Sequence, residues 1–295
     1  MATANANGIQ IEYETFGETS HPALLLIIGL GAQLIHWQDE FCQQIADAGY
    51  YVIRYDNRDA GLSTKFEGLS AEETMEKIGG LIMGQKVPVA YTIEDMANDA
   101  QGLLDALNID NAHICGMSMG GFIAQNFALN HPARSLSLTS IYSTPGNRTK
   151  FPPTQEVSEA MMKPVPLERK PYIEYMIEFY KLTYGSGLPF DEDYHSTLFG
   201  KAYDRSLCPE GSLRQLLASM TQNDRTSKLG ELKVPTLIIH GDADPLVPLA
   251  GGQATADAIP GAKLMVIKGM GHVTPNLNAY WDKIKDAMID HMEKG

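Results

Sequence analysis

The chain has 295 residues, of which 44% are hydrophobic, enough for a substantial core in one large α/β domain or two ordinary ones. Its formal net charge of −13 argues against nucleic acid or an anionic membrane as a main partner. The N-terminus lacks a basic start followed by an apolar run, and the three widely spaced cysteines fit no disulfide framework or metal site. We therefore expect a cytoplasmic protein with free thiols.

Short apolar runs alternate with amphipathic helical patterns along most of the chain, which is typical of a parallel sheet flanked by helices. Several predicted strands are near-continuous runs of leucine, isoleucine and valine, as expected for strands buried on both faces. The predicted strands are residues 10–16, 23–28, 51–55, 112–116, 136–141, 236–240 and 264–267. The sequence therefore predicts an α/β fold with a mostly parallel central sheet.

The loop after the predicted strand 23–28 reads Gly29-Leu30-Gly31. Its glycines let the backbone come close to a substrate at the sheet edge where ligands gather in parallel sheets. A main-chain N–H presented there can stabilise a developing oxyanion. We predict that the N–H of Leu30 has this role.

Residues 66–90 form a long run that leaves the sheet after strand 51–55. Ser70 and Glu73 make a capping box, which predicts a helix from about Ala71 that ends at Gly79-Gly80. The apolar residues Leu81, Ile82 and Met83 follow. We hypothesise that this run is a mobile cover whose apolar triplet lines a hydrophobic pocket; a surface excursion packed on the core is the alternative.

The next elements are a helix and a strand. Thr92 and Asp95 are typical of a helix start, and they predict a helix over residues 93–107. The strand 112–116 then leads into a helical pattern, and between the two stands the run Gly116-Met117-Ser118-Met119-Gly120-Gly121.

This strand–turn–helix context is that of a nucleophile elbow, in which glycines permit a strained turn that exposes a serine hydroxyl. We predict that Ser118 is the catalytic nucleophile. The amide of Met119, directly after it, is the second predicted oxyanion donor.

Residues 144–225 interrupt the alternation of strands and helices. Two stretches have apolar residues at helical spacing and no strand is convincing, which predicts helices inserted between two sheet strands. The stretches are Ile173, Met176, Ile177 and Tyr180, and Leu213, Leu216, Leu217 and Met220. We therefore divide the chain into a core domain, residues 1–143 and 226–295, and an inserted helical cap, residues 144–225.

Two aspartates, Asp242 and Asp244, follow the predicted strand 236–240. A catalytic histidine needs a carboxylate that fixes its orientation. Asp244 lies deeper in the loop, with Pro245 fixing the turn behind it, whereas Asp242 is better placed to bond loop amides. We predict Asp244 as the catalytic acid.

The predicted strand 264–267 leads to the glycine-rich loop 269–271 and then to His272. Catalytic groups of open parallel sheets gather at this edge. We predict His272 as the general base. Three other histidines, His113, His131 and His240, lie within or near predicted strands and helices and are not preceded by a glycine-rich loop, so we do not prefer them. The order serine, aspartate, histidine is that of α/β-hydrolases. A last helix is predicted over residues 277–292.

These residues, taken in this order, resemble the α/β-hydrolase superfamily, and within it the subgroup of esterases that contains aclacinomycin methylesterase. The resemblance covers about residues 8–290 and rests on the stretches LLLIIGLGAQLIHWQDEF, YVIRYDNRDAGLST, ICGMSMGG, VPTLIIHGDADPLVP and IKGMGH. It places Ser118, Asp244 and His272 on the family's triad, and Leu30 and Met119 on its oxyanion-hole positions.

The expected function is that of a serine esterase that acts on a small-molecule ester through an acyl-enzyme intermediate, without metal or organic cofactor. The same triad leaves open a perhydrolase, thioesterase, acyltransferase or carbon–carbon bond hydrolase. A small-molecule receptor built on a hydrolase fold is the alternative outside enzymes. The sequence leaves the natural acyl and alcohol groups and the oligomeric state undetermined.

Overall fold

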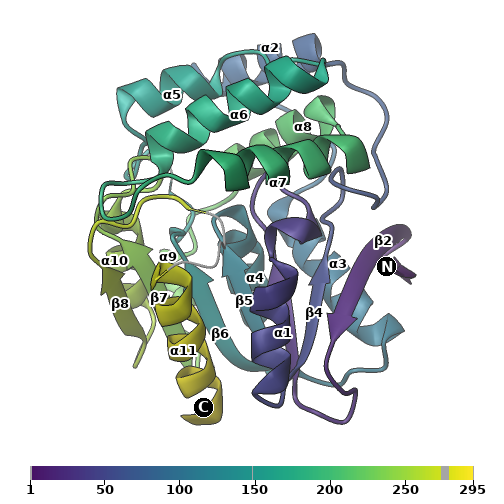
Figure 1. Cartoon of the computed structure of the whole chain (residues 1–295), viewed down its shortest axis with the longest axis vertical. Helices are drawn as coiled ribbons and strands as arrows, with labels where there is room; N and C mark the ends of the chain where they lie inside the picture. The colour runs from purple at the N-terminus through teal and green to yellow at the C-terminus, as the bar shows by residue number, and fades with distance from the viewer. Residues whose placement is uncertain (1, 148, 274–278, 295) are drawn as a thin grey trace.

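A central sheet of eight strands organises the protein in the computed structural model, which describes residues 2–147, 149–273 and 279–294 (Figure 1). The strands are arranged in the order β1-β2-β4-β3-β5-β6-β7-β8. β2 pairs antiparallel with both β1 and β4, whereas all pairs from β4 to β8 are parallel. The predicted fold class, a mostly parallel sheet flanked by helices, is confirmed.

Each of the seven predicted strands is present. The strands are β1 (Ala2–Ala6), β2 (Ile9–Phe16), β3 (Ala23–Ile27), β4 (Tyr51–Tyr55), β5 (Ala112–Met117), β6 (Ser135–Ile141), β7 (Thr236–Gly241) and β8 (Lys263–Ile267). β1 was not predicted, because its residues are small and polar and only Ala6 is buried. It forms as an edge strand through its pairing with β2.

The helices are α1 (Asp39–Asp47), α2 (Ala71–Ile82), α3 (Ile93–Ala106), α4 (Met119–Asn130), α5 (Gln155–Met161), α6 (Arg169–Thr183), α7 (Glu192–Arg205), α8 (Pro209–Thr221), α9 (Thr226–Leu229), α10 (Leu249–Ala258) and α11 (Ala279–Lys294). The predicted helix 277–292 corresponds to α11; residues 277 and 278 lie outside the described residues. None of the helices that the structure describes is long and apolar enough to cross a bilayer.

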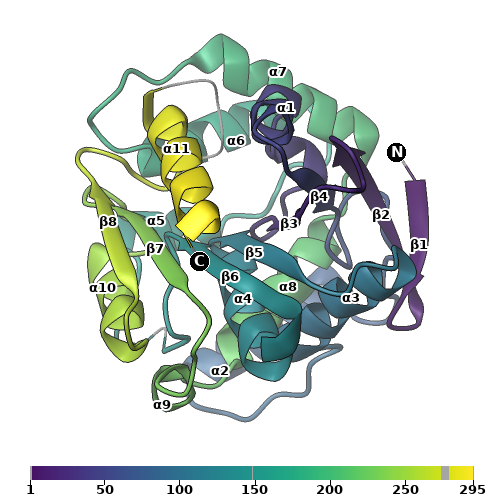
Figure 2. The same ribbon diagram turned by 90° about the horizontal axis from the view of Figure 1, so that it is seen from below.

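The sheet has an apolar layer on each face, because successive strand residues point to opposite faces. In β3, Leu25 and Ile27 pack with residues of α3 and α4, whereas Leu24 and Leu26 pack with residues of α1 and α11. Figure 2 shows α1 and α11 on one face of the sheet and α3, α4 and α10 on the other. All five residues of β3 are buried, which explains its continuous apolar sequence.

Helices α5 to α8 lie together beyond the carboxyl ends of the parallel strands, at the top of Figure 1. They come from the segment between β6 and β7, and the predicted apolar stretches fall on α6 and α8. α6 packs on α7, and α2, from a distant part of the sequence, packs on α8. The strand ends of the sheet therefore face a layer of helices.

The predicted end of α2 at Gly79-Gly80 is wrong, because the helix continues to Ile82. The capping box at Ser70 and Glu73 is present as predicted. The left-handed residue that ends the helix is Gly84, with φ of 82°, and the next amide donates to the carbonyl of Gly80 at 2.9 Å, which is the bond of a Schellman motif. A glycine inside a helix costs about 1 kcal/mol. Apolar packing of α2 on α8 offsets that cost.

Buried histidines make the fold sensitive to acid. Burial lowers the pKa of His113 and of His36 to about 4 in the folded protein, from an ordinary value of 6.5. Both side chains are therefore neutral in the fold and take up a proton more readily after unfolding. Their contribution to stability is complete above about pH 6.5 and is lost as the pH falls toward about 4.

We expect the urea midpoint to fall when the pH is lowered from 7.5 to 5.5. In the variant His113→Gln this fall should be shallower, because each such histidine contributes up to about 1.4 kcal/mol per pH unit in this window. Equilibrium unfolding followed by circular dichroism measures both slopes. Equal slopes in the two proteins would show that His113 titrates alike in the folded and unfolded states.

Candidate active site

Ser118 occupies a strained turn between β5 and α4. Its φ of 56° and ψ of −122° are unusual for a residue with a side chain, and such strain costs on the order of 1–3 kcal/mol. The turn is close to β3: a Cβ atom at Gly120 would lie 2.2 Å from the carbonyl oxygen of Ile27. Only glycine fits there. This geometry matches the nucleophile elbow predicted from the sequence.

His272 and Asp244 form a hydrogen-bonded pair in the loops that follow β8 and β7. The imidazole Nδ1 lies 2.7 Å from Oδ2 of Asp244, whose side chain is buried. The other carboxylate oxygen accepts hydrogen bonds from the amides of Leu246 and Val247, at 2.9 and 2.8 Å. A carboxylate held in this way keeps the Nδ1 proton on the imidazole and leaves Nε2 available as a base.

Two neighbouring residues support this pair without belonging to it. Asp242 accepts a hydrogen bond from the amide of Gly269 at 2.6 Å, so it braces the loop that carries the histidine. His240 is fully buried, and its Nε2 lies 2.8 Å from the carbonyl oxygen of Val247. Burial lowers the pKa of His240, so a neutral ring stabilises the aspartate loop.

The two residues predicted as oxyanion donors line the same cavity as Ser118 and His272. Met119 is the first residue of α4 and follows the serine directly. The loop that carries Leu30 runs beside the serine, because a Cβ atom at Gly29 would lie only 3.3 Å from the Cβ of Ser118. The structure thus brings together the five residues that the sequence singles out.

Tyr142 was not identified from the sequence. It directly follows β6, its φ is 34°, and its ring centroid lies 4.4 Å from that of His272. Its hydroxyl donates to the carbonyl of Val273 at 2.7 Å. A tyrosine just after a strand, on the edge where Ser118 and the loops of Asp244 and His272 lie, is the signal that could have revealed it.

The histidine loop is also bonded to the end of α6, which sequence reasoning missed. The amide of His272 donates to the carbonyl of Thr183 at 2.7 Å, and that of Gly271 donates to the carbonyl of Tyr184 at 3.0 Å. Gly185 and Met270 form an isolated antiparallel bridge. The backbone of residues 183–187 therefore fixes the position of the loop that carries the imidazole.

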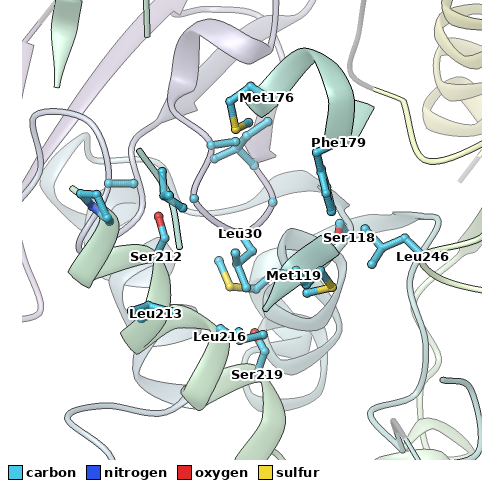
Figure 3. A pocket seen from close by; sticks show the side chains of 18 of the residues that line it. Leu30, Ser118, Met119, Met176, Phe179, Ser212, Leu213, Leu216, Ser219 and Leu246 are labelled. Atoms are coloured by element: carbon cyan, nitrogen blue, oxygen red, sulfur yellow. The ribbon is translucent and has the colours of Figure 1, made fainter. Parts of the chain in front are cut away.

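A cavity of about 620 Å³ lies between the strand ends and the helical layer (Figure 3). Ser118 and His272 contribute to its wall, but most wall side chains are apolar, aromatic or methionine. Figure 3 shows several of them around the serine, namely Leu30, Met119, Met176, Phe179, Leu213, Leu216 and Leu246. A largely apolar cavity with a few polar groups is typical of a small-molecule site.

The residues of the run 66–90 that line the cavity are not the ones that the hypothesis named. Ala71, Glu72 and Met75 at the start of α2 contribute to the wall, whereas Leu81, Ile82 and Met83 do not. The predicted wall role of this triplet is wrong: Leu81 packs against the cluster formed with α8, and the other two side chains are 65% and 74% exposed. The predicted mobility of this run remains a hypothesis.

Within the described ranges, no group of three or more histidine, cysteine, aspartate or glutamate side chains is placed to hold a metal ion. The groups at the cavity that suit carbonyl chemistry are the hydroxyl of Ser118, the His272–Asp244 pair, and the main chain at Leu30 and Met119. Together these groups can carry out attack on a carbonyl carbon.

Comparison with known proteins places this chain among hydrolases. The chain is 28% identical to the rhodomycin D methylesterase DauP of Streptomyces sp. (strain C5), with 89% of this chain and 88% of that one covered. It is 27% identical to a 2-hydroxy-6-oxononadienedioate/2-hydroxy-6-oxononatrienedioate hydrolase of Burkholderia vietnamiensis, with 90% and 85% covered.

The fold is also that of a solved enzyme, the enol-lactonase from Burkholderia xenovorans LB400. The TM-score is 0.74 at 22% identity, and the match covers 99% of this chain and 100% of that one. In addition, residues 19–276 match the family described as serine aminopeptidase S33. The chain therefore belongs to this S33 family of hydrolases, within the α/β-hydrolase superfamily.

Proposed function

We propose that this protein hydrolyses neutral, largely apolar carboxylic esters through an acyl-enzyme intermediate on Ser118. The observation that carries the proposal is the arrangement of the cavity. A serine in a strained turn and a histidine paired with a buried aspartate border one apolar space. The methylesterase relative supports ester hydrolysis as the reaction.

In the proposed mechanism, Nε2 of His272 takes the proton of Ser118 as Oγ attacks the ester carbonyl carbon. The main-chain N–H groups of Leu30 and Met119 stabilise the resulting oxyanion. When the tetrahedral intermediate collapses, the C–O bond to the alcohol breaks and the alcohol leaves with the proton from the imidazole. Asp244 stabilises the imidazolium in between.

The acyl group is then transferred to water. His272 takes a proton from a water molecule, whose oxygen attacks the acyl carbonyl, and the bond to Oγ breaks as the serine regains its proton. The products are an acid and an alcohol. Only water is consumed, so the proposed reaction requires no cofactor.

The charges on the cavity wall favour a neutral substrate. Lys163 is the only lysine or arginine among the described wall residues, and it is exposed. Glu72 and Glu210 also line the wall, whereas the carboxylate of Asp59 is buried and paired with Arg214 at 2.8 Å. Moving a second substrate carboxylate from water into such a site would be costly, because no buried cation would pair with it. This disfavours a dicarboxylate substrate such as the one in the name of the Burkholderia vietnamiensis relative.

A matched pair of substrates tests the proposal. We expect kcat/KM for p-nitrophenyl butyrate to exceed that for p-nitrophenyl hemisuccinate by at least about tenfold, equivalent to about 1.4 kcal/mol. Methyl esters of apolar acids of increasing size should also be hydrolysed, since the cavity holds a drug-sized ligand. Equal or better hydrolysis of the hemisuccinate would contradict the preference for a neutral acyl group. Failure to hydrolyse any ester would contradict the proposed function.

A further inference from the structure

The loop that carries Leu30, residues 29–34 and here called the oxyanion loop, is hydrogen-bonded to α8. The amide of Gly31 donates to Oε1 of Gln215 at 2.8 Å. The amide nitrogen of the same side chain donates to the carbonyl of Arg58 at 2.7 Å. Gln215 is fully buried, so this one side chain joins the oxyanion loop to the segment after β4.

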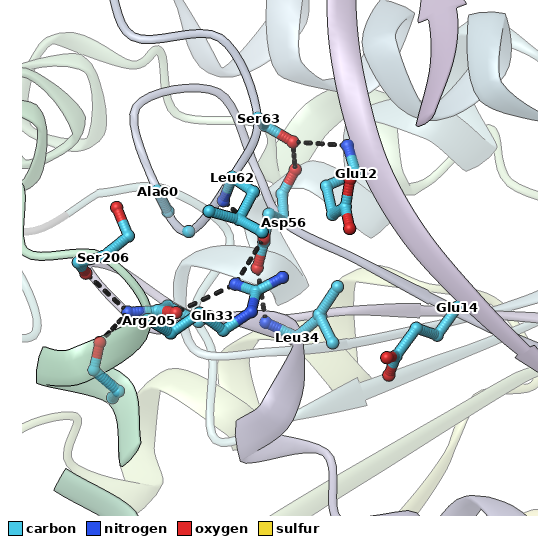
Figure 4. A network of polar contacts seen from close by, with 12 residues as sticks. Glu12, Glu14, Gln33, Leu34, Asp56, Ala60, Leu62, Ser63, Arg205 and Ser206 are labelled. Atoms are coloured by element: carbon cyan, nitrogen blue, oxygen red, sulfur yellow. Dashed lines mark hydrogen bonds and ion pairs between the residues drawn. The ribbon is translucent and has the colours of Figure 1, made fainter. Parts of the chain in front are cut away.

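A second connection runs from α7 (Figure 4). Nη1 of Arg205 donates to Oε1 of Gln33 at 2.9 Å and to Oδ2 of Asp56 at 2.7 Å. The other oxygen of Asp56 accepts a hydrogen bond from the amide of Leu34 at 2.7 Å. The Gln33 side chain also donates to two main-chain carbonyls at the end of α7, each at 2.7 Å.

The start of the loop, in contrast, is held by the core domain: Asn57 donates to the carbonyl of Ile28 at 3.0 Å. Leu30 lies between this anchor and those at residues 31–34. Gln215 and Arg205 do not belong to the described wall of the cavity. Any effect they have on the reaction must therefore be indirect, through the oxyanion loop or through the α8 residues of the wall, and the test below separates the two.

We propose that Gln215 and Arg205 are positioning residues that hold the N–H of Leu30 where the oxyanion forms. Through these two residues, the position of α7 and α8 relative to the sheet determines how well the oxyanion of the transition state is stabilised. A displacement of about 1 Å in such a group can cost on the order of 10²-fold in rate. This inference rests on the proposed ester hydrolysis and on Leu30 as a donor.

The variant Gln215→Met keeps the side-chain length but removes both hydrogen bonds. We expect kcat to fall by about 10- to 100-fold, a part of the loss caused by removing an oxyanion donor, while KM changes by less than about threefold. Gln125→Met is the matched control, since Gln125 is equally buried and bonded to Ser140 and Arg225, away from the oxyanion loop. It should lose stability with little change in kcat.

A trifluoromethyl ketone separates positioning from general loss of structure. Its adduct with the serine places an oxyanion in the hole, so its affinity should fall in parallel with kcat/KM in Gln215→Met. A methyl ketone of the same shape forms no adduct when Ser118 is replaced by alanine. Its affinity should therefore be the same for Ser118→Ala and for the double variant that also carries Gln215→Met. Arg205→Lys keeps a positive charge near Asp56, but the lysine side chain is one bond shorter than the arginine up to Nη1 and loses the hydrogen bond to Gln33. This variant should also lower kcat, by several-fold. It replaces Gln215→Met as the test if Gln215→Met does not fold.

The inference is overturned if folded Gln215→Met or Arg205→Lys keeps the wild-type kcat and trifluoromethyl ketone affinity. It is also overturned if Gln125→Met loses kcat to the same extent as Gln215→Met. Failure of the proposed function is a different result, because the wild-type protein itself would then hydrolyse no ester.

Discussion

Replacing Ser118 with alanine is expected to abolish nearly all ester hydrolysis, with kcat on an activated ester falling roughly 10⁴-fold or more. The reason is that no other group in the proposed mechanism can carry the acyl chain. Activity left over would come from the oxyanion donors and from binding alone. Initial rates on p-nitrophenyl butyrate measure the loss. Thermal unfolding should show no destabilisation, because the native φ of 56° strains serine and alanine alike.

A fluorophosphonate probe gives the independent readout. Mass spectrometry of the labelled wild-type protein should find the phosphonate on Ser118 alone, and the alanine variant should remain unlabelled. Ser219→Ala is the control, since Ser219 is another serine of the cavity wall and is buried. This control should still be labelled at Ser118. Labelling at another residue, together with activity in Ser118→Ala, would refute the proposed nucleophile.

The second large effect is expected from Asp244→Asn, which should lower kcat/KM by roughly 10³- to 10⁴-fold. The amide can still accept the hydrogen bonds from Leu246 and Val247, so the loop should keep its shape. It cannot, however, stabilise the imidazolium of His272, and its NH₂ group favours the wrong tautomer of the ring. Correct folding, checked by circular dichroism, makes the rate interpretable.

Asp242→Asn is the matched control in the same loop. Its carboxylate contacts the amide of Gly269 and not the imidazole, and an asparagine oxygen can still accept that bond. We therefore expect at most a few-fold loss of kcat/KM. If Asp242→Asn were the more damaging of the two, the assignment of the acid would be reversed.

The sheet could be predicted, and the candidate catalytic residues could be singled out, because their signals are local. Buried strands such as β3 are continuous apolar runs, and Ser118 and His272 stand on glycine-rich turns directly after strands. The choice between Asp242 and Asp244 also rested on loop position alone. The predictions of the strands, of Ser118 and His272, and of Asp244 over Asp242 each used information from about ten neighbouring residues.

The features that escaped prediction depend on contacts between distant segments. α2 extends through Gly79-Gly80 because it packs on α8, a helix more than one hundred residues away. The partners of the oxyanion loop, Gln215 and Arg205, lie on α8 and α7 and carry no motif. Their polar side chains at helix positions are typical of a solvated face. Only the packing of the helices shows that Gln215 is buried and that both side chains are bonded to the loop.

The bonds from residues 183–187 to the histidine loop determine how the substrate range of this protein can be altered by engineering. A chimera that received the α5–α8 segment of a relative would lose the contacts at Thr183 and Tyr184 unless the donor segment matched them. Substitutions in the middle of α6, at Met176 and Phe179, reshape the cavity and leave those junctions intact. Point changes on this helix should therefore shift the proposed ester preference, whereas exchange of the whole segment should succeed only when the donor segment keeps the main-chain path at residues 183 and 184.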